Sequence, residues 1–300
     1  MVALQYKFTS DILFKMFFTR HEELLCSLVA AALGKTPEDI KTLEIKNPEI
    51  LPEEIGGKFC RLDLNMVIND EIVDLEIQVG NEGNFKERAL YYWSRLFSAS
   101  LGEGKDYALT PRTILIGILD FNLFDCAEIM SEFAAMEKTR HEILTDRMCI
   151  LFYELNKLPD LIDINDKMQV WLKLISVKTE EDLAEIERME VEEMAQAVNA
   201  YKQITKMPDY QELERIRSKA RHDEAQALSN ARKQGQIEGQ QQGLQQGMQQ
   251  GIQQGIQQGI QQGQRNANEE TAKMLLALGD PVDKISAVTN LSHEEIEALK

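Results

Sequence analysis

Two short alternating segments joined by a polar pair constrain the fold of this 300-residue chain more than any other feature. In residues 61–68 and again in residues 72–79, apolar and polar side chains alternate, and Asn69-Asp70 separates the two segments. A period of two is typical of β-strands with one apolar face, and a polar pair between them is suited to a tight turn. The sequence therefore predicts a β-hairpin. Its polar positions are Asp63, Asn65, Asp74, Glu76 and Gln78.

The acidic residues of the two segments fall on the same face of the predicted hairpin. Because neighbouring strands lie about 5 Å apart, Asp63 and Glu76 are expected to come close enough to share one divalent cation. A simpler interpretation is also open, since an amphipathic hairpin often turns a polar face to solvent. The two interpretations differ in whether these carboxylates act together on an ion or are hydrated separately.

An Asp, a hairpin and then Glu-x-Gln resemble the catalytic core of the PD-(D/E)XK nucleases. The resemblance is closest to the Rpn (recombination-promoting nuclease) proteins, also described as PD-(D/E)XK nuclease family transposases. Further similarity lies in residues 9–18, in the segment Arg88-Ala89-Leu90-Tyr91-Tyr92-Trp93 and in a glycine-punctuated tail. The resemblance implies an α/β fold with a PD-(D/E)XK (restriction-endonuclease-like) core of order αβββαβ, followed by an all-helical C-terminal extension.

The resemblance also implies a metal-dependent DNA endonuclease. Asp63, Glu76 and the backbone carbonyl of Ile77 would hold Mg²⁺ or Mn²⁺, and hard oxygen ligands suit both ions. The family often has Lys at the position of Gln78, and Gln orients water by hydrogen bonding without carrying charge. Asp11 has two open interpretations: it stabilises the positive end of its helix, or it is an acid that holds a second cation or water.

The charge of the chain opposes unspecific binding of nucleic acid. With 50 acidic and 33 basic residues the formal net charge is −17, whereas phosphate contacts depend on Lys and Arg. A nuclease of this composition must therefore depend on bound metal and a local basic strip. Lys86 and Arg88 are the candidates for contacts with nucleic-acid phosphates.

Other classes of protein are not indicated. No apolar run approaches the roughly 20 residues of a membrane span, and the first residues lack the charged and apolar blocks of a signal peptide. The four histidines show no spacing typical of zinc sites. The four cysteines contain no CxxC pair, so they are interpreted as buried, reduced thiols of a cytoplasmic protein. They are Cys26, Cys60, Cys126 and Cys149.

Periodicity and end signals predict the remaining elements of the first part of the chain. A helix capped by Thr9 or Ser10 should run to about Leu33 and end at Gly34. A strand is expected within residues 40–50, and a second helix from Phe85 to Leu101 after a capping box of Asn84 and Glu87. The remaining predicted strands are 113–119, which is apolar throughout, and a second hairpin of 132–136 and 148–155.

The second part of the chain is predicted to be helical. Four regions are expected: a nuclease-like domain (1–160), a helical accessory region (161–230), a glycine- and glutamine-rich repeat (231–265) and a small helical module (266–300). Short accessory helices are indicated around residues 170–175, 183–189 and 194–201, and a longer charged helix after Pro208.

Glycine recurs at every fourth residue from Gly235 to Gly263, mostly with Gln-Gln and one apolar residue between. Such a row permits close approach of two helices, but each interior Gly costs about 1 kcal/mol of helix stability. A self-associating helix and a flexible Gln-rich tether are therefore both open. The final segment resembles a small helix-turn-helix-like tail with a capping box of Ser292 and Glu295. Its acidic last helix favours a protein contact over DNA reading.

Two functions are consistent with these residues and patterns. The first is a Mg²⁺-dependent DNA endonuclease acting in recombination, mobile-element biology or phage defence. The second is a weakly active or inactive relative that works as an oligomerising binding or regulatory protein. A homo-oligomer formed through the Gly235–Gly263 repeat and the C-terminal module is expected if the repeat is a self-associating helix.

Overall fold

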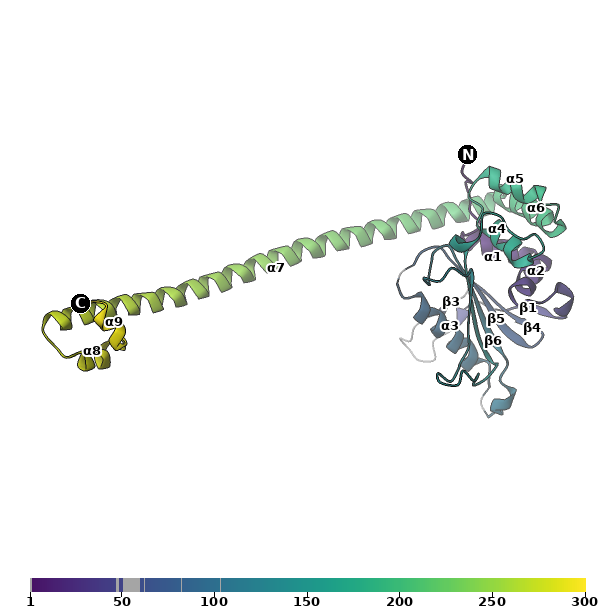
Figure 1. The fold of residues 1–300 in the computed structure, drawn as a ribbon. Coiled ribbons are helices and arrows are strands. Elements are labelled where there is room, and N and C mark those ends of the chain that lie inside the picture. Colours follow the sequence, from purple (N-terminus) through teal and green to yellow (C-terminus); the bar gives the residue numbers. More distant parts are fainter. Residues whose placement is uncertain (1, 47–48, 51–59, 62, 82, 103) are drawn as a thin grey trace. The chain divides into compact units, whose positions relative to one another are not determined.

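A computed structural model describes residues 2–46, 49–50, 60–61, 63–81, 83–102 and 104–300. The chain divides into two compact units, Met1–Arg217 and Ser218–Lys300. The first contains the sheet and most of the helices, whereas the second consists of helices (Figure 1).

A six-stranded mixed sheet forms the centre of the first unit, with the order β1-β4-β5-β6-β8-β7. β5 and β6 pair in parallel, as do β6 and β8, while the other neighbours are antiparallel. The predicted α/β class therefore fits. In sheet order the strands are β1 (Leu43–Ile45), β4 (Leu64–Ile68), β5 (Glu71–Gln78), β6 (Thr113–Leu119), β8 (Met148–Glu154) and β7 (Met130–Phe133). A separate two-stranded sheet pairs β2 (Glu49–Ile50) with β3 (Cys60–Arg61).

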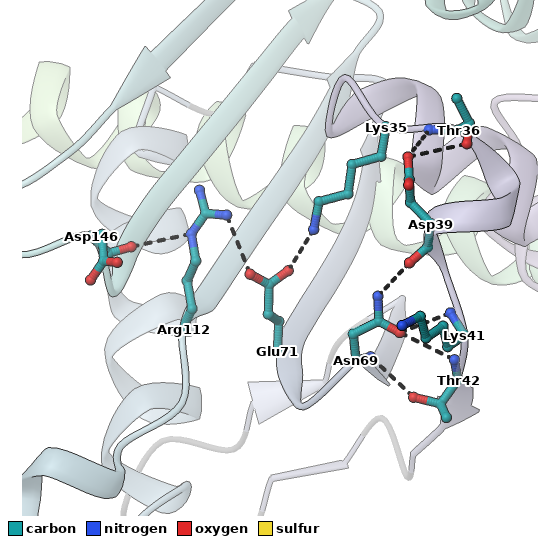
Figure 2. Close-up of polar contacts among 9 residues, drawn as sticks. All are labelled: Lys35, Thr36, Asp39, Lys41, Thr42, Asn69, Glu71, Arg112 and Asp146. Atoms are coloured by element: carbon teal, nitrogen blue, oxygen red, sulfur yellow. Dashed lines mark hydrogen bonds and ion pairs between the residues drawn. The ribbon is translucent and has the colours of Figure 1, made fainter.

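The predicted hairpin is formed by β4 and β5. Asn69 and Asp70 have φ angles of 48° and 69°, and a turn with two left-handed residues matches the twist of the flanking strands. The Asn69 side chain also accepts backbone hydrogen bonds from Lys41 and Thr42 and donates one to the carbonyl of Asp39 (Figure 2). The turn is thereby attached to the loop before β1, which fixes where the hairpin starts.

Beside the turn, the first residue of β5 is held from both sides. The Glu71 carboxylate accepts hydrogen bonds from Lys35 at 3.1 Å and Arg112 at 3.4 Å (Figure 2). Arg112 also donates to the backbone carbonyl of Asp146. These contacts join the ends of the central strands, so β5 keeps a fixed register beside β6.

One face of the sheet is covered by helices from both ends of the first unit (Figure 1). Apolar side chains of the helices pack with the inward residues of β4, β5, β6 and β8 in one large cluster, which includes Phe14, Phe17, Leu75, Ile116 and Trp171. The helices are α1 (Asp11–Arg20), α2 (Glu22–Ala32), α4 (Lys167–Ile175), α5 (Glu180–Arg188) and α6 (Glu192–Lys206). This cluster is the main core.

The opposite face of the sheet is covered by α3 (Phe85–Ala99) (Figure 1). Phe85 and Ala89 pack against Leu115, Ile150 and Phe152 of the sheet. Because both faces are covered, all residues of β6 are buried, which confirms the interpretation of its continuous apolar run. Short 3₁₀ helices also belong to this unit: η1 (Pro37–Asp39), η2 (Tyr107–Leu109) and η3 (Leu155–Lys157).

Several predicted boundaries are wrong in detail. The single helix predicted from Thr9 or Ser10 to Leu33 is two helices that meet at His21. The Ser10 side chain does not cap α1, and the Asn84 side chain does not cap α3, so the predicted capping box is not formed. Instead, the Ser10 hydroxyl donates to Glu214. Gly34, with φ of 64°, does end α2 as predicted.

The strand predictions need similar corrections. The strand predicted for residues 61–68 begins at Leu64, while Asp63 lies in a bend; Leu62 is outside the described residues. The predicted strand 132–136 is seen as Met130–Phe133, and Met136 forms only an isolated bridge with Ile143. β7 and β8 nevertheless pair as the predicted second hairpin.

A continuous helix, α7 (Pro208–Ala277), includes every glycine of the repeat. The structure thus shows the helical form of the repeat. The start of the predicted small helical module (266–300) is the end of α7. Leu275 and Ala272 of that end pack with α8 (Val282–Thr289) and α9 (His293–Glu297) in a small apolar cluster.

The capping box of Ser292 and Glu295 opens α9 as predicted. Within the described ranges, no helix combines the length and apolar character that a bilayer crossing requires.

Candidate active site

Asp63 and Glu76 face each other at one end of the hairpin. The backbone N–H of Asp63 donates to Oε1 of Glu76 at 2.9 Å, and the backbone N–H of Ile77 donates to Oδ2 of Asp63 at 2.9 Å. The strand register explains the contact, because Leu64 pairs with Leu75 and the preceding Asp63 therefore arrives beside Glu76. The chain bends at Asp63, just before β4 begins. Its carboxylate, and not its backbone, therefore accepts the hydrogen bond from the backbone N–H of Ile77 in β5.

Gln78 connects this acidic pair to α3. Its side-chain amide donates to Oε2 of Glu76 at 3.3 Å, and its carbonyl oxygen accepts a hydrogen bond of 2.5 Å from Nη2 of Arg88. The Arg88 guanidinium also lies 5.0 Å from the centre of the Phe85 ring. The amide is thus oriented by both neighbours, with oxygen toward the cation and nitrogen toward the carboxylate.

The acids of β5 on the polar face of the hairpin are buried. Glu76 is 2% exposed and Asp74 0% exposed, whereas Asp63, Asn65 and Gln78 are half-buried, so the interpretation of this face as a solvated surface is wrong for the β5 acids. α3 covers it, and burial of ionised carboxylates without strong compensation is costly. Because burial of these carboxyls is unfavourable for folding, we attribute their presence to function and not to stability.

Gly117 of β6 lies directly beside Glu76 in the sheet. A Cβ atom here would stand 2.9 Å from Cδ1 of Phe152 and 3.6 Å from Cε1 of Phe85. The missing side chain thus lets the two aromatic rings pack beneath α3. Through Phe85, this packing also supports the guanidinium of Arg88.

The protonation of the acidic pair reflects this environment. Burial raises the pKa of Asp63 to about 6, against the backbone hydrogen bond from Ile77, which lowers it. Burial, followed by the charge of Asp63, raises the pKa of Glu76 to about 8. Displaced pKa values of neighbouring carboxyls are typical of functional sites. Both carboxyls are therefore harder to ionise in the fold than in water.

Asp74 lies two residues before Glu76 on the same face of β5. In the portion of the chain that the structure describes, neither of its carboxylate oxygens has a hydrogen-bond partner. Burial, and then the charges of Glu76 and Asp63, hold the pKa of Asp74 well above its usual range.

Asp11 is the first residue of α1, and its charge raises the pKa of Asp63, while the charges of Lys15 and Arg88 lower it. Asp11 and Lys15 are one helical turn apart and therefore share a face of α1. The Asp11 carboxylate accepts a hydrogen bond of 2.9 Å from Nη2 of Arg217. The site thus receives one acid and two cations from α1 and α3.

Lys86 is a predicted site residue that the structure places elsewhere. Its ammonium lies 4.5 Å from the centre of the Phe124 ring, whereas Arg88 points to Gln78. Two residues of a helix that are two positions apart point to nearly opposite sides. The basic strip expected from Lys86 and Arg88 is therefore divided.

The oxygen atoms of the pair are ligands of the kind that hard divalent cations prefer. Across the described residues, no three His, Cys, Asp or Glu side chains converge as a complete metal site. Mg²⁺, however, commonly takes only one or two carboxylates and keeps several waters. Asp63 and Glu76 supply two hard carboxylates, and Asp63 uses only Oδ2 in its hydrogen bond with Ile77. The carbonyl of Ile77 is the third ligand that the resemblance implies.

Three residues beside the pair were not predicted from the sequence. Lys15 had an available signal, because it follows Asp11 by four residues in a predicted helix. Gly117 had a weaker one, as the single glycine in an apolar strand, where a glycine often marks close packing. Arg217 had none, since 206 residues separate it from Asp11.

Comparison with known proteins identifies the family of the chain. Searches of curated proteins and of solved structures give no match. The family model described as "PD-(D/E)XK nuclease family transposase" matches residues 8–231, which include the hairpin, α1, α3 and the first turns of α7. The chain therefore belongs to the PD-(D/E)XK nuclease family transposases.

Proposed function

We propose that this protein is a Mg²⁺- or Mn²⁺-dependent endonuclease that hydrolyses phosphodiester bonds of DNA. The observation that carries the proposal is the pairing of Asp63 with Glu76: the Glu76 carboxylate accepts the backbone N–H of Asp63, and the Asp63 carboxylate accepts that of Ile77. Burial raises the pKa of both carboxyls, so their ionised forms are unfavourable in the fold. A bound cation would supply the charge that compensates them.

Each residue then has a distinct part. Asp63, Glu76 and the carbonyl of Ile77 would hold the cation, which offsets charge on the scissile phosphate and makes its bound water more acidic. Gln78, oriented by Arg88, would accept a hydrogen bond from the attacking water or donate one to it. Asp11 would hold a second cation or water.

Positive charge near the pair answers the objection from the net charge of −17. Arg88 and Lys15 both act electrostatically on Asp63. A phosphate approaching this end of the hairpin therefore meets cations from two helices. Local charge of this kind steers a ligand even when the whole chain is acidic.

The proposal is tested by nicking of supercoiled plasmid with Mg²⁺ or Mn²⁺. Asp63→Ala and Glu76→Ala should each lower the nicking rate by about 10²-fold or more, because charge stabilisation at the reacting phosphate is lost. Glu87→Ala, at an exposed position of α3 beside Arg88, is the matched control and should leave the rate unchanged. Nicking that survives in both site variants would refute the proposal.

Substrate is tested in the same assay. We expect cleavage of DNA and no cleavage of a single-stranded or duplex RNA of equal length. A recombination or mobile-element role is in keeping with the family description and belongs to this proposal.

We place the activity in the cytoplasm, and the free thiols Cys26, Cys126 and Cys149 support this. The last two differ in exposure: Cys149 is buried, but Cys126 is exposed, contrary to expectation.

Self-association is a second proposal, favoured by the surface of α7. One apolar residue follows each glycine from Gly243 to Gly259, and this row is 52–75% exposed: Leu244, Met248, Ile252, Ile256 and Ile260. A four-residue period advances about 40° per repeat around a straight helix, so a partner must wrap around α7 in a right-handed sense. Deletion of residues 235–263 should lower the oligomer mass measured by light scattering by more than the mass of the deleted residues. An unchanged mass would exclude the repeat as the interface.

A further inference from the structure

The first turns of α7 pack against the start of α1. Tyr210 is buried, and its ring meets that of Tyr6 edge to face with centroids 5.1 Å apart. The Ser10 hydroxyl donates to Oε2 of Glu214 at 2.9 Å. Because 210, 214 and 217 are spaced by four and three residues, the three side chains lie on one face of α7. That face is directed at the residue that opens α1.

Arg217 and Asp11 form the last contact of this face. Nη2 of Arg217 lies 2.9 Å from Oδ2 of Asp11, and both belong to the first unit. Their side chains are 51% and 36% exposed. Exposed ion pairs contribute little to stability, so this pair is not needed to hold α7 on α1, which Tyr210 already does.

Asp11 therefore stands between two charged partners. On one side is the Arg217 guanidinium, and on the other is Asp63, whose carboxyl feels the negative charge of Asp11. A divalent cation bound by Asp63 and Glu76 would be attracted to the same Asp11 charge that Arg217 now neutralises. Two cations thus compete for one carboxylate.

We propose that Arg217 is a positioning residue of the candidate active site, which holds Asp11 and competes with a divalent cation for its carboxylate. The inference rests on the proposed metal site at Asp63 and Glu76. Its consequence is that the start of α7 adjusts how strongly the site binds metal. A change that withdraws Arg217 releases Asp11 and strengthens cation binding.

The test is Mn²⁺ titration of the full chain by calorimetry, without nucleic acid. Arg217→Gln should lower the Kd for Mn²⁺ about three- to ten-fold, because the Asp11 carboxylate is released from its ion pair and attracts the cation. Arg217→Lys keeps the charge and should stay within about two-fold of wild type. In an Asp11→Asn background, Arg217→Gln should change the Kd by less than about two-fold.

Arg215→Gln is the matched control. Arg215 lies on the same helix and pairs with Glu212 through two hydrogen bonds of 2.7 Å, away from Asp11. It should leave the Kd for Mn²⁺ unchanged, and melting temperatures measured in parallel separate an effect on folding from one on binding.

The possible results are distinguishable. An unchanged Kd in Arg217→Gln, or an equal change with and without the Asp11 carboxylate, overturns the inference and leaves the proposed function standing. Loss of Mn²⁺ binding in Asp63→Ala establishes the site that is being titrated. A wild-type chain that binds no Mn²⁺ removes the proposed function and this inference together.

Discussion

β5 and the repeat of α7 depart from the usual distribution of polar and apolar residues in opposite directions. In β5 the carboxyls of Asp74 and Glu76 are buried, and in α7 a row of Leu, Met and Ile is exposed. Burying a charged group and exposing an apolar row both cost free energy. The rest of the first unit follows the ordinary rule, with apolar helices on one face of the sheet.

The difference teaches where to look for function. Binding of a cation would stabilise a buried carboxylate, and binding of a protein surface would stabilise an exposed apolar row. The two regions are therefore expected to respond differently to the same kind of substitution. Removing charge from β5 should stabilise the fold and remove activity. Removing apolar surface from α7 should change neither the stability of the first unit nor the activity.

The largest expected effect belongs to Glu76→Gln. Because the pKa of Glu76 in the fold is about 8, above its ordinary value of 4.5, the folded state prefers the protonated group. Its ionisation therefore destabilises the fold as pH rises between these two values. The neutral amide should raise the melting temperature at pH 8 by about 3–8 °C and lower nicking about 10²-fold or more.

Near pH 4 the same substitution should have little effect on melting, since Glu76 is then largely protonated in both folded and unfolded chains. Thermal melts of wild type and variant at pH 4 and pH 8 measure the difference. Equal melting temperatures at pH 8 would mean that the burial of Glu76 has no cost, and the contrast with α7 would lose its basis.

The next effect is the pH dependence of stabilisation by metal. A cation binds the ionised carboxylates of Asp63 and Glu76, whose raised pKa values are about 6 and 8. Binding therefore releases protons and strengthens as pH rises through this range. The rise in melting temperature caused by about 1 mM Mn²⁺ should grow from pH 6 to pH 8 and level off above it. A shift that is constant over this range would contradict metal binding at the pair.

Glycine substitutions sharpen the comparison through packing. Gly117→Ala places a Cβ 2.9 Å from Phe152 and should destabilise the first unit by about 1–3 kcal/mol. Gly247→Ala meets no atom within 4 Å and should stabilise α7 by about 1 kcal/mol. Urea unfolding followed by circular dichroism measures both. Gly247→Ala should also weaken self-association if glycine is there for close helix approach.

The smallest effect on folding is expected for the apolar row. Replacing Ile252, Ile256 and Ile260 together by Gln should change the melting temperature of the first unit by less than about 1 °C, because these side chains belong to the second unit and are 52–58% exposed. The same variant should lose mass by light scattering. If mass is kept while stability falls, the row belongs to folding, and the contrast with β5 disappears.

The outline of the sheet was predictable, but several contacts were not. Alternation in residues 61–68 and 72–79 identified the hairpin, and the apolar run of 113–119 identified a strand covered on both faces, because these patterns are local. The break of the first helix at His21 and the uncapped start of α3 were missed. Helix caps depend on which neighbour a side chain bonds, and Ser10 bonds Glu214 from a distant helix.

The candidate site also contains residues that the sequence predicted and residues that only the structure identified. Asp63, Glu76 and Gln78 were found from their spacing in two adjacent segments. Lys86 was expected beside Arg88, but helix geometry and the Phe124 ring direct it elsewhere. Gly117 and Arg217 join the surroundings of the pair only because parallel pairing and the docking of α7 bring distant segments together.

The sequence by itself determined the hairpin, the pairing of Asp63 with Glu76 and the helical period of the repeat, because each follows from short spacings along one chain. Only the tertiary structure decided that the polar face of β5 is buried and that its carboxyls have raised pKa values. It also decided that Arg217 reaches Asp11. Those outcomes depend on which helix covers which face of the sheet, and burial and charge are set by such distant neighbours.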